Sequence, residues 1–188
     1  MDFEIKIIQF LQSGRSPFFD VSFQIFSMFG TFLAVCAFLL FLLVYNRKLA
    51  LCYLLSYGFV FVIVSIVKML VARERPFAVC EEIELIGKIS SDYSFPSGHT
   101  ACAMSIAIFL GTFLFEKYKG KSSKVWIVLC LTIYVGLVAL SRMYLGAHYL
   151  TDLLAAMAIS AVVCSIGLVV MKIFMKKGIE NEITNGDK

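Results

Sequence analysis

Five apolar stretches without a charged residue divide this chain of 188 residues: 21–45, 49–67, 100–115, 125–141 and 153–171. A helix needs about 20 residues to cross the roughly 30 Å hydrocarbon core of a bilayer, and the stretches are close to that length. They do not alternate between polar and apolar residues as membrane barrel strands do, so they predict helices. We therefore expect an all-α fold, a polytopic transmembrane bundle of about five spanning helices in a single domain, 1–188.

The two ends of the chain depart from this pattern. Residues 1–14 place Phe3, Phe10 and Leu11 at helical spacing among charged residues, which predicts a short helix lying in the membrane interface. That this segment belongs to a further span is an open alternative. No short apolar core leads to a small-residue cleavage site, so we expect no cleaved signal peptide. Residues 178–188 are polar and predict a cytoplasmic tail.

Lysine and arginine residues gather in three segments: 47–48, 117–124 and 172–177. Short loops rich in these residues face the cytoplasm. With five spans the three segments share one side, which leaves the 74–94 loop and the 142–149 turn on the extracytoplasmic face of the cell membrane. The same bias explains the net charge of +4. The basic residues form no stripe with aromatic residues between them, so we expect no nucleic acid partner.

The six cysteines are expected to be packing residues. Five lie inside predicted spans and no CxxC pair occurs, so the sequence predicts neither a disulfide framework nor a thiolate metal site. Cys80 lies in the predicted outer loop, where it can report on the orientation of the chain.

A first pair of cations lies where the second apolar stretch ends. Lys68 closes that stretch, and Arg75 follows seven residues later, directly before Pro76. If a helix continued to Arg75, both cations would share one face two turns apart, although Pro76 limits such a helix. Side chains of this kind also reach from a span to lipid headgroups, so snorkelling is the plain alternative.

The sequence Pro96-Ser97-Gly98-His99 stands before the third stretch. A helix that begins here presents backbone N–H groups at the positive end of its dipole, which favours an anion. Gly98 lets the anion approach the backbone, the Ser97 hydroxyl adds a donor, and His99 lies in the first turn. The stretch is short for a span, so we expect it to recruit residues from Tyr93 onward. A simple helix cap with an interfacial histidine is the alternative.

Arg142, His148 and Asp152 surround the turn between the fourth and fifth stretches. His148 and Asp152 are four residues apart, which places them on one face at the start of the fifth span. A carboxylate there accepts the Nδ1 hydrogen, fixes the tautomer and leaves Nε2 with its lone pair. A structural His–Asp cap beside a snorkelling arginine is the alternative.

These groups fall on one predicted face of the membrane, whereas unrelated charges would scatter over both. Phosphoryl transfer needs such a set. Cations and N–H groups hold the phosphoryl oxygens, one imidazole attacks phosphorus and the other protonates the leaving oxygen. The same cations would repel a divalent ion, so we expect no metal and no other cofactor.

The three signature motifs of the type-2 phosphatidic acid phosphatase family resemble, in order and spacing, three segments of this chain: Lys68-x6-Arg75-Pro76, Pro96-Ser97-Gly98-His99 and Arg142-x5-His148-x3-Asp152. The family includes membrane lipid phosphatases, glucose-6-phosphatase and larger, soluble vanadium-dependent haloperoxidases. This small apolar chain resembles the lipid branch. The motifs cover 68–152, nearly half of the chain.

Carried over by position, the resemblance implies a role for each residue. His148 is the expected nucleophile, which forms a phosphohistidine, Asp152 orients it, and His99 is the general acid. The phosphoryl group is expected to be held by Lys68, Arg75, Ser97, Gly98 and Arg142.

The resemblance implies a metal-independent hydrolase that acts on a lipid phosphate or diphosphate at the outer face. Undecaprenyl diphosphate is the first expected substrate, and phosphatidylglycerol phosphate, phosphatidic acid and diacylglycerol diphosphate are alternatives. A non-catalytic lipid-phosphate binding or transport protein would need the cations but not His148 with Asp152, so it is the weaker hypothesis. The expected partners are the lipid substrate and the bilayer, and the sequence predicts no oligomeric state.

Overall fold

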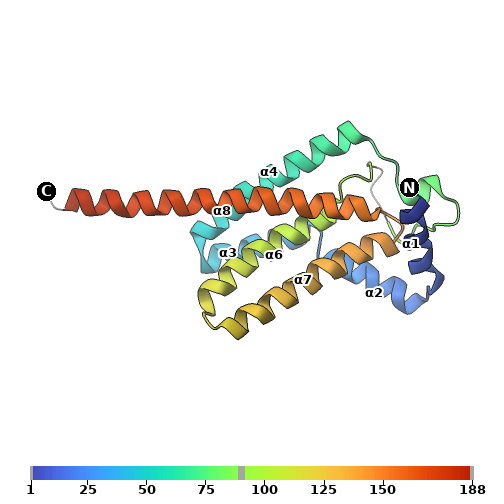
Figure 1. Cartoon of the computed structure of the whole chain (residues 1–188), viewed down its shortest axis with the longest axis horizontal. Coiled ribbons are helices and arrows are strands. Elements are labelled where there is room, and N and C mark those ends of the chain that lie inside the picture. Colours follow the sequence, from blue (N-terminus) through green and yellow to red (C-terminus); the bar gives the residue numbers. More distant parts are fainter. Residues whose placement is uncertain (1, 89–91, 187–188) are drawn as a thin grey trace.

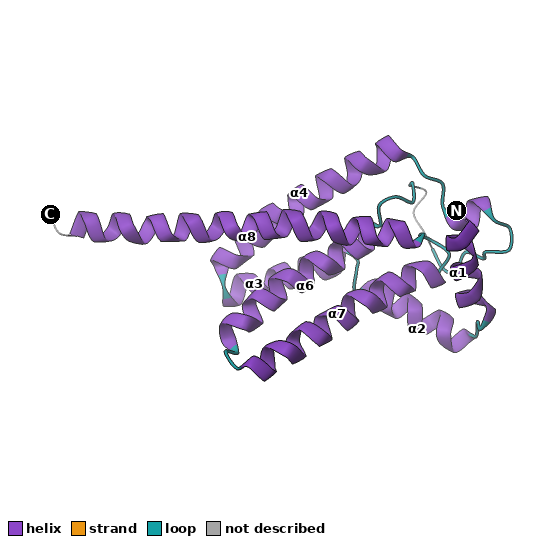
Figure 2. Cartoon of the chain, viewed as in Figure 1, coloured by secondary structure: helices purple, strands orange, loops and turns teal. Residues whose placement is uncertain are grey.

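The computed structural model describes residues 2–88 and 92–186, and every regular element in these ranges is a helix (Figure 1, Figure 2). The elements follow in chain order as α1 (Asp2–Ser13), α2 (Pro17–Met28), α3 (Phe32–Tyr45), α4 (Arg47–Val71), α5 (Pro76–Val79), α6 (Gly98–Lys117), α7 (Lys121–Tyr144) and α8 (Leu150–Gly186). The predicted all-α class is confirmed.

Four helices are long and apolar enough to cross a membrane: α4, α6, α7 and α8. α2 and α3 together form a fifth candidate, bent by 47° where they join. Side chains that point away from the bundle are mostly large and apolar, such as Phe61, Leu70 and Val162. Such a continuous apolar surface suits lipid hydrocarbon rather than water.

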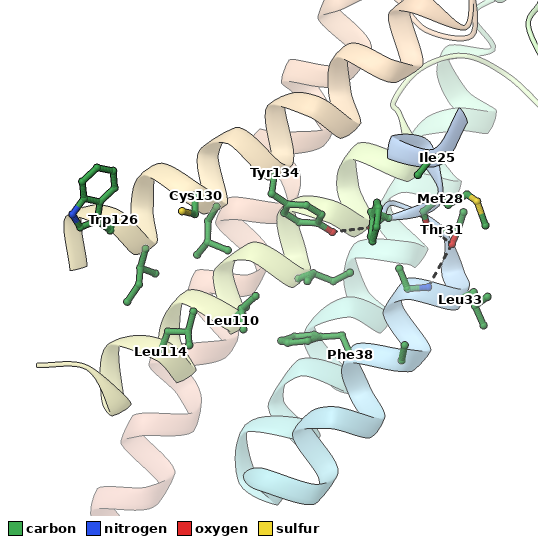
Figure 3. A pocket seen from close by; sticks show the side chains of 16 residues that line it. Ile25, Met28, Thr31, Leu33, Phe38, Leu110, Leu114, Trp126, Cys130 and Tyr134 are labelled. Carbon is green, nitrogen blue, oxygen red and sulfur yellow. Dashed lines mark hydrogen bonds between the residues drawn. The ribbon is translucent and has the colours of Figure 1, made fainter. Parts of the chain in front are cut away.

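The prediction of one helix over 21–45 is wrong, because α2 and α3 break it. The Thr31 hydroxyl caps α3 by accepting a backbone N–H of its first turn at 3.4 Å. The Tyr134 hydroxyl of α7 donates to the Phe29 carbonyl at 2.8 Å, which satisfies a backbone group at the end of α2 (Figure 3). The broken helix thus keeps its polar backbone atoms bonded inside an apolar layer.

Gly30 lies at this break and packs closely against the first turn of α6. A Cβ atom on Gly30 would lie 2.6 Å from the carbonyl oxygen of His99 and 2.7 Å from Cγ1 of Val138. No side chain larger than hydrogen has that room. The glycine therefore lets the bend pack beside the first turn of α6, next to the expected general acid.

The helices run back and forth along the bundle, so their connections gather at two ends (Figure 1). The basic segments 47–48, 117–124 and 172–177 share one end, as predicted from their lysines and arginines. α1, α5, the segments 80–88 and 92–97 and the 145–149 turn lie at the other end, which we call the site end because it holds the predicted site residues.

α1 lies across the site end (Figure 1). With 12 residues it is too short to span a bilayer. Ile8 is fully buried against the bundle, whereas Phe3 and Phe10 are largely exposed, as an interfacial helix requires. The Gln12 amide fixes its end by donating to the Tyr144 carbonyl at 2.8 Å.

α4, α6 and α8 pack on one another in the middle of the bundle, and α7 covers α6. Tyr53 of α4 is fully buried, with ring centroids 5.0 Å from Phe38 and 5.2 Å from Phe109. α8 continues beyond the other helices (Figure 1), so the predicted polar tail 178–188 is helical as far as Gly186. Residues 187 and 188 lie outside the described residues.

Candidate active site

A polar cavity of about 110 Å³ lies at the site end of the bundle. It is lined by Lys68, Arg75, Lys88, Asp92, Gly98, His99, Arg142 and His148. Six of these are predicted site residues, and the other two predicted residues, Ser97 and Asp152, lie directly behind Gly98 and His148. Four cationic side chains against one carboxylate suit the cavity to an anion.

His148 lies in the turn before α8, not on its first turn as its spacing from Asp152 suggests. It is 2% exposed. Its Nδ1 is 3.4 Å from Oδ2 of Asp152, and its Nε2 is 3.4 Å from Nη1 of Arg75. These contacts assign the hydrogen to Nδ1 and the lone pair to Nε2, which faces the cavity.

Burial is the main cause that lowers the pKa of His148 to about 4. The hydrogen bond with Asp152 acts in the opposite direction, and the charges of Arg142 and Arg75 lower the pKa further. The imidazole is therefore neutral near pH 7, the form in which Nε2 can attack phosphorus.

The Asp152 carboxylate is fully buried and held from several sides. Oδ2 accepts the Tyr149 N–H at 2.9 Å and a hydrogen bond from the Ser94 hydroxyl. Oδ1 accepts from Nη1 of Arg73 at 2.7 Å. A buried charge with this many donors is compensated and fixed in place.

Lys68 and Arg75 do not share one helix face, because α4 ends at Val71 and Ala72 takes a left-handed conformation with φ 46°. The two cations converge through the loop instead. Nζ of Lys68 is 2.7 Å from Oδ2 of Asp92, and Nη2 of Arg75 donates to Oδ1 of the same carboxylate at 2.6 Å. Asp92 thus bridges the two cations that were expected to hold the phosphoryl group.

α6 begins at Gly98 with Ser97 as its cap, so the expected recruitment of residues from Tyr93 onward is wrong. The Ser97 oxygen accepts from the backbone N–H of Thr100 at 3.4 Å and from its hydroxyl at 3.0 Å. The Ser97 hydroxyl hydrogen therefore remains as a donor. A Cβ atom on Gly98 would meet nothing within 4 Å, so open space reaches the backbone here, as expected for an anion site.

Arg142 is 5% exposed and donates from Nη1 to the Ser27 hydroxyl at 2.6 Å. Within the described ranges, its Nε is one of two buried side-chain nitrogen or oxygen atoms that have no hydrogen-bond partner. A buried guanidinium hydrogen without an acceptor is costly, and a phosphoryl oxygen in the cavity would accept it.

An apolar groove of about 710 Å³ adjoins the polar cavity. Tyr57, Val60, Phe61 and Val64 of α4 and Phe32 of α3 form much of its wall. Lys68, Asp92, Gly98 and His99 line both spaces, whereas His148 lines the cavity and not the groove. His99 therefore lies where the cavity meets the groove, whereas His148 lies at the cavity alone. In the part of the chain that the structure describes, no three His, Cys, Asp or Glu side chains are placed to hold a metal ion.

Five residues of this site were not predicted from the sequence: Glu4, Arg73, Lys88, Asp92 and Ser94. Arg73 stands between Lys68 and Arg75. A third cation at the end of a span is a sequence signal that could have identified it as a site residue. Ser94 is a buried hydroxyl two residues before Pro96. No local pattern marks Glu4, whose site contacts are with Arg73 and Thr151.

Comparisons with known proteins give a consistent result. The model of the PAP2 superfamily matches residues 49–177. The lipid A 4′-phosphatase of Bacteroides thetaiotaomicron is 27% identical over 166 residues, which are 82% of this chain and 70% of that protein. An undecaprenyl-diphosphatase of Sulfolobus acidocaldarius is 29% identical over 110 residues, and the match covers 58% of this chain and 49% of the relative.

Among solved structures, the crystal structure of LpxE from Aquifex aeolicus superposes with a TM-score of 0.75 at 25% identity, covering 88% of this chain and 94% of that one. The match to the family model covers all three motifs, and the helical bundle agrees with it. The chain belongs to the PAP2 superfamily and is a multi-pass membrane lipid phosphate phosphatase.

Proposed function

We propose that this enzyme hydrolyses a phosphomonoester or diphosphate of a membrane lipid through a phosphohistidine on His148, without a metal ion. The observation that carries the proposal is the position of His99, which lines both the polar cavity and the apolar groove. A lipid whose phosphate enters the cavity and whose tail follows the groove places its leaving oxygen beside His99. In-line attack requires His148 to approach phosphorus from the opposite side, and His148 lines the cavity but not the groove.

The proposed reaction has two steps. First, Nε2 of His148 forms a bond to phosphorus while the bond to the leaving oxygen breaks, and His99 gives that oxygen a proton. Second, His99 takes a proton from water, whose oxygen attacks the phosphohistidine. This releases inorganic phosphate and restores the neutral His148.

Lys68, Arg75 and Arg142 would neutralise the non-bridging oxygens, the task that Mg²⁺ performs in kinases. The Gly98 backbone and the Ser97 hydroxyl complete the cradle. Asp152 holds the Nδ1 hydrogen of His148 and stabilises the positive charge that forms on the ring.

We propose the extracytoplasmic face for this site. The support is that the three basic segments lie at the end of the bundle opposite the site. A variant that keeps only Cys80, at the site end, should react with a membrane-impermeant maleimide in intact cells. Protection of Cys80 until the cells are lysed would reverse the orientation.

Undecaprenyl diphosphate is the substrate we propose. The support is the apolar groove beside the cavity, which suits a long hydrocarbon chain, and the similarity to an undecaprenyl-diphosphatase. Lipid A 4′-phosphate is the second candidate, because the match to a lipid A 4′-phosphatase covers more of this chain. Phosphatidylglycerol phosphate and phosphatidic acid complete the comparison.

The test is phosphate release by purified protein in detergent from these four lipids, with EDTA present. We expect activity that survives EDTA, is inhibited by vanadate and is highest in kcat/KM on undecaprenyl diphosphate. A higher kcat/KM on lipid A assigns the second candidate. Loss of all activity in EDTA, with rescue by one divalent metal, would contradict the proposed mechanism.

A further inference from the structure

Arg73 connects the expected nucleophile to the interfacial helix α1. It directly follows the left-handed Ala72 at the end of α4, which brings its side chain to the start of α8. Nη1 of Arg73 donates to Oδ1 of Asp152 and to the Thr151 hydroxyl, each at 2.7 Å. Its guanidinium lies 3.7 Å from the centroid of the Tyr149 ring. The side chain is therefore fixed by charge, hydrogen bonds and stacking.

Glu4 of α1 holds the other side of this guanidinium. Its Oε2 accepts from Nη2 of Arg73 at 2.8 Å. Its Oε1 accepts the backbone N–H and the hydroxyl of Thr151, both at 2.8 Å, in the first turn of α8. Burial raises the pKa of Glu4, but the hydrogen bonds from Thr151 and Arg73 outweigh burial and leave that pKa lowered. Glu4 is thus an ionised partner for Arg73 at neutral pH.

Asp152 uses its two oxygens for different neighbours. Oδ2 faces Nδ1 of His148 at 3.4 Å, and Oδ1 accepts from Arg73. Without Arg73, Oδ1 would lose its charged donor in a fully buried position, and only the bonds from Tyr149 and Ser94 to Oδ2 would still hold the carboxylate. A carboxylate held at one oxygen can tilt, which changes the distance from Oδ2 to Nδ1 and the direction in which Nε2 points.

We propose that Arg73, held by Glu4, is a positioning residue that fixes the Asp152 carboxylate and, through it, the attacking nitrogen of His148. The inference rests on the proposed role of His148 as nucleophile. It also gives α1 a part in catalysis, since a helix at the membrane interface then supports the reactive ring through a chain of three side chains.

The test compares full-length variants in detergent on phosphatidic acid and p-nitrophenyl phosphate. Supports of this kind typically contribute about 10- to 100-fold to activity at metal sites, and we expect Arg73→Gln to lower kcat by a similar factor. KM should stay within about twofold, because Arg73 does not line the cavity. The factor should be the same for both substrates, since the nucleophile is needed for every leaving group. Arg73→Lys should recover part of kcat.

Glu4→Gln should lower kcat less than Arg73→Gln does. The double variant should be no slower than Arg73→Gln alone, because Glu4 acts through Arg73. The matched control is Arg15→Gln, which removes another arginine of the site end that pairs with Asp20 and Glu84 and should leave kcat unchanged.

The amount of trapped phosphoenzyme per enzyme molecule distinguishes the possible outcomes. A wild-type enzyme that forms no phosphoenzyme contradicts the proposed nucleophile before any variant is compared. Given a wild-type phosphoenzyme that His148→Ala lacks, an Arg73→Gln variant with kcat within about twofold of wild type overturns the positioning role. A variant with fewer active molecules but normal turnover per active molecule also overturns it, because Arg73 would then have a purely structural role. A loss confined to phosphatidic acid would also overturn it, since Arg73 would then act on the leaving group.

Discussion

Nη1 of Arg75 lies 3.4 Å from Nε2 of His148, so the atom proposed to attack phosphorus faces a cation proposed to hold its oxygens. On the other side of the ring, Nδ1 is 3.4 Å from the Asp152 carboxylate. The imidazole is held between an anion and a cation before substrate binds. Such an arrangement requires little reorganisation when charge moves through the ring.

The two histidines should respond differently to the leaving group. An alkoxide leaving from phosphatidic acid needs a proton, whereas a nitrophenolate hardly does, and general acid catalysis contributes about 10² to 10⁴ in rate. His99→Ala should therefore lose most activity on phosphatidic acid and retain much more on p-nitrophenyl phosphate. His148→Ala should be inactive on both. Equal losses for His99→Ala, with leaving-group dependence in His148→Ala, would exchange the two roles.

The acidic limb of the pH profile should report His148. Because burial lowers its pKa to about 4, kcat/KM should stay high down to about pH 5 and fall as the pH drops through about 4, where the nucleophile gains a proton. An acidic limb centred near pH 6.5 would mean that His148 is not the buried, neutral group described above.

The same lowered pKa makes stability depend on pH. An unfolded histidine binds its proton near pH 6.5, above the folded value of about 4. The contribution of the buried neutral ring is therefore complete above about pH 6.5 and is lost as the pH falls toward 4. Thermal unfolding in detergent should show a smaller acid-induced loss for His148→Gln than for wild type. Identical pH dependences would contradict the assignment.

Asp92 should compete with phosphate. Its carboxylate bonds Lys68 and Arg75, the donors that a phosphoryl group needs. The carboxylate is 42% exposed, so these ion pairs contribute only about 1 kcal/mol, or about fivefold in affinity. Asp92→Asn should tighten inhibition by vanadate by that factor, and Glu82→Gln, on the same loop, should not. Weaker inhibition in Asp92→Asn would show that the carboxylate organises the cations instead of occupying them.

Gly30 should tolerate no side chain. Gly30→Ala would place a Cβ atom against the His99 carbonyl, and overpacking of this kind typically costs about 1–3 kcal/mol. We expect a lower unfolding temperature and a reduced kcat, because the first turn of α6 carries His99. Gly58→Ala is the matched control, since a Cβ atom there meets nothing within 4 Å. A similar loss in Gly58→Ala would mean that the close approach at Gly30 is not the cause.

Local sequence was sufficient for six of the eight residues that line the cavity. Charge is rare in this chain's spans, so Lys68 and Arg142 stand out. Pro96 and Gly98, just before His99, indicate the start of a helix. All eight predicted residues lie at or directly behind the cavity. The helical class followed from apolar stretches of spanning length.

The sequence did not predict contacts between residues that lie far apart in the chain. Glu4 and Thr151 are 147 positions apart, and only the folded chain brings them together. The break between α2 and α3 was also missed, because no proline interrupts 21–45 and the Tyr134 hydroxyl that compensates it comes from α7. Asp92 was overlooked because a carboxylate is not an obvious neighbour for a phosphate site.

The unpartnered Nε of Arg142 has a consequence for evolution and engineering. A buried donor with no acceptor lowers the stability of the resting protein, and the same unmet hydrogen bond is what a tetrahedral anion would receive on binding. Selection for a longer-lived protein alone would replace this arginine with an apolar side chain of similar length, such as methionine. With the phosphate-binding role proposed above, Arg142 represents a compromise in which part of the fold's stability is given up for affinity. Consensus or stability-guided redesign of this membrane enzyme should therefore leave position 142 unchanged.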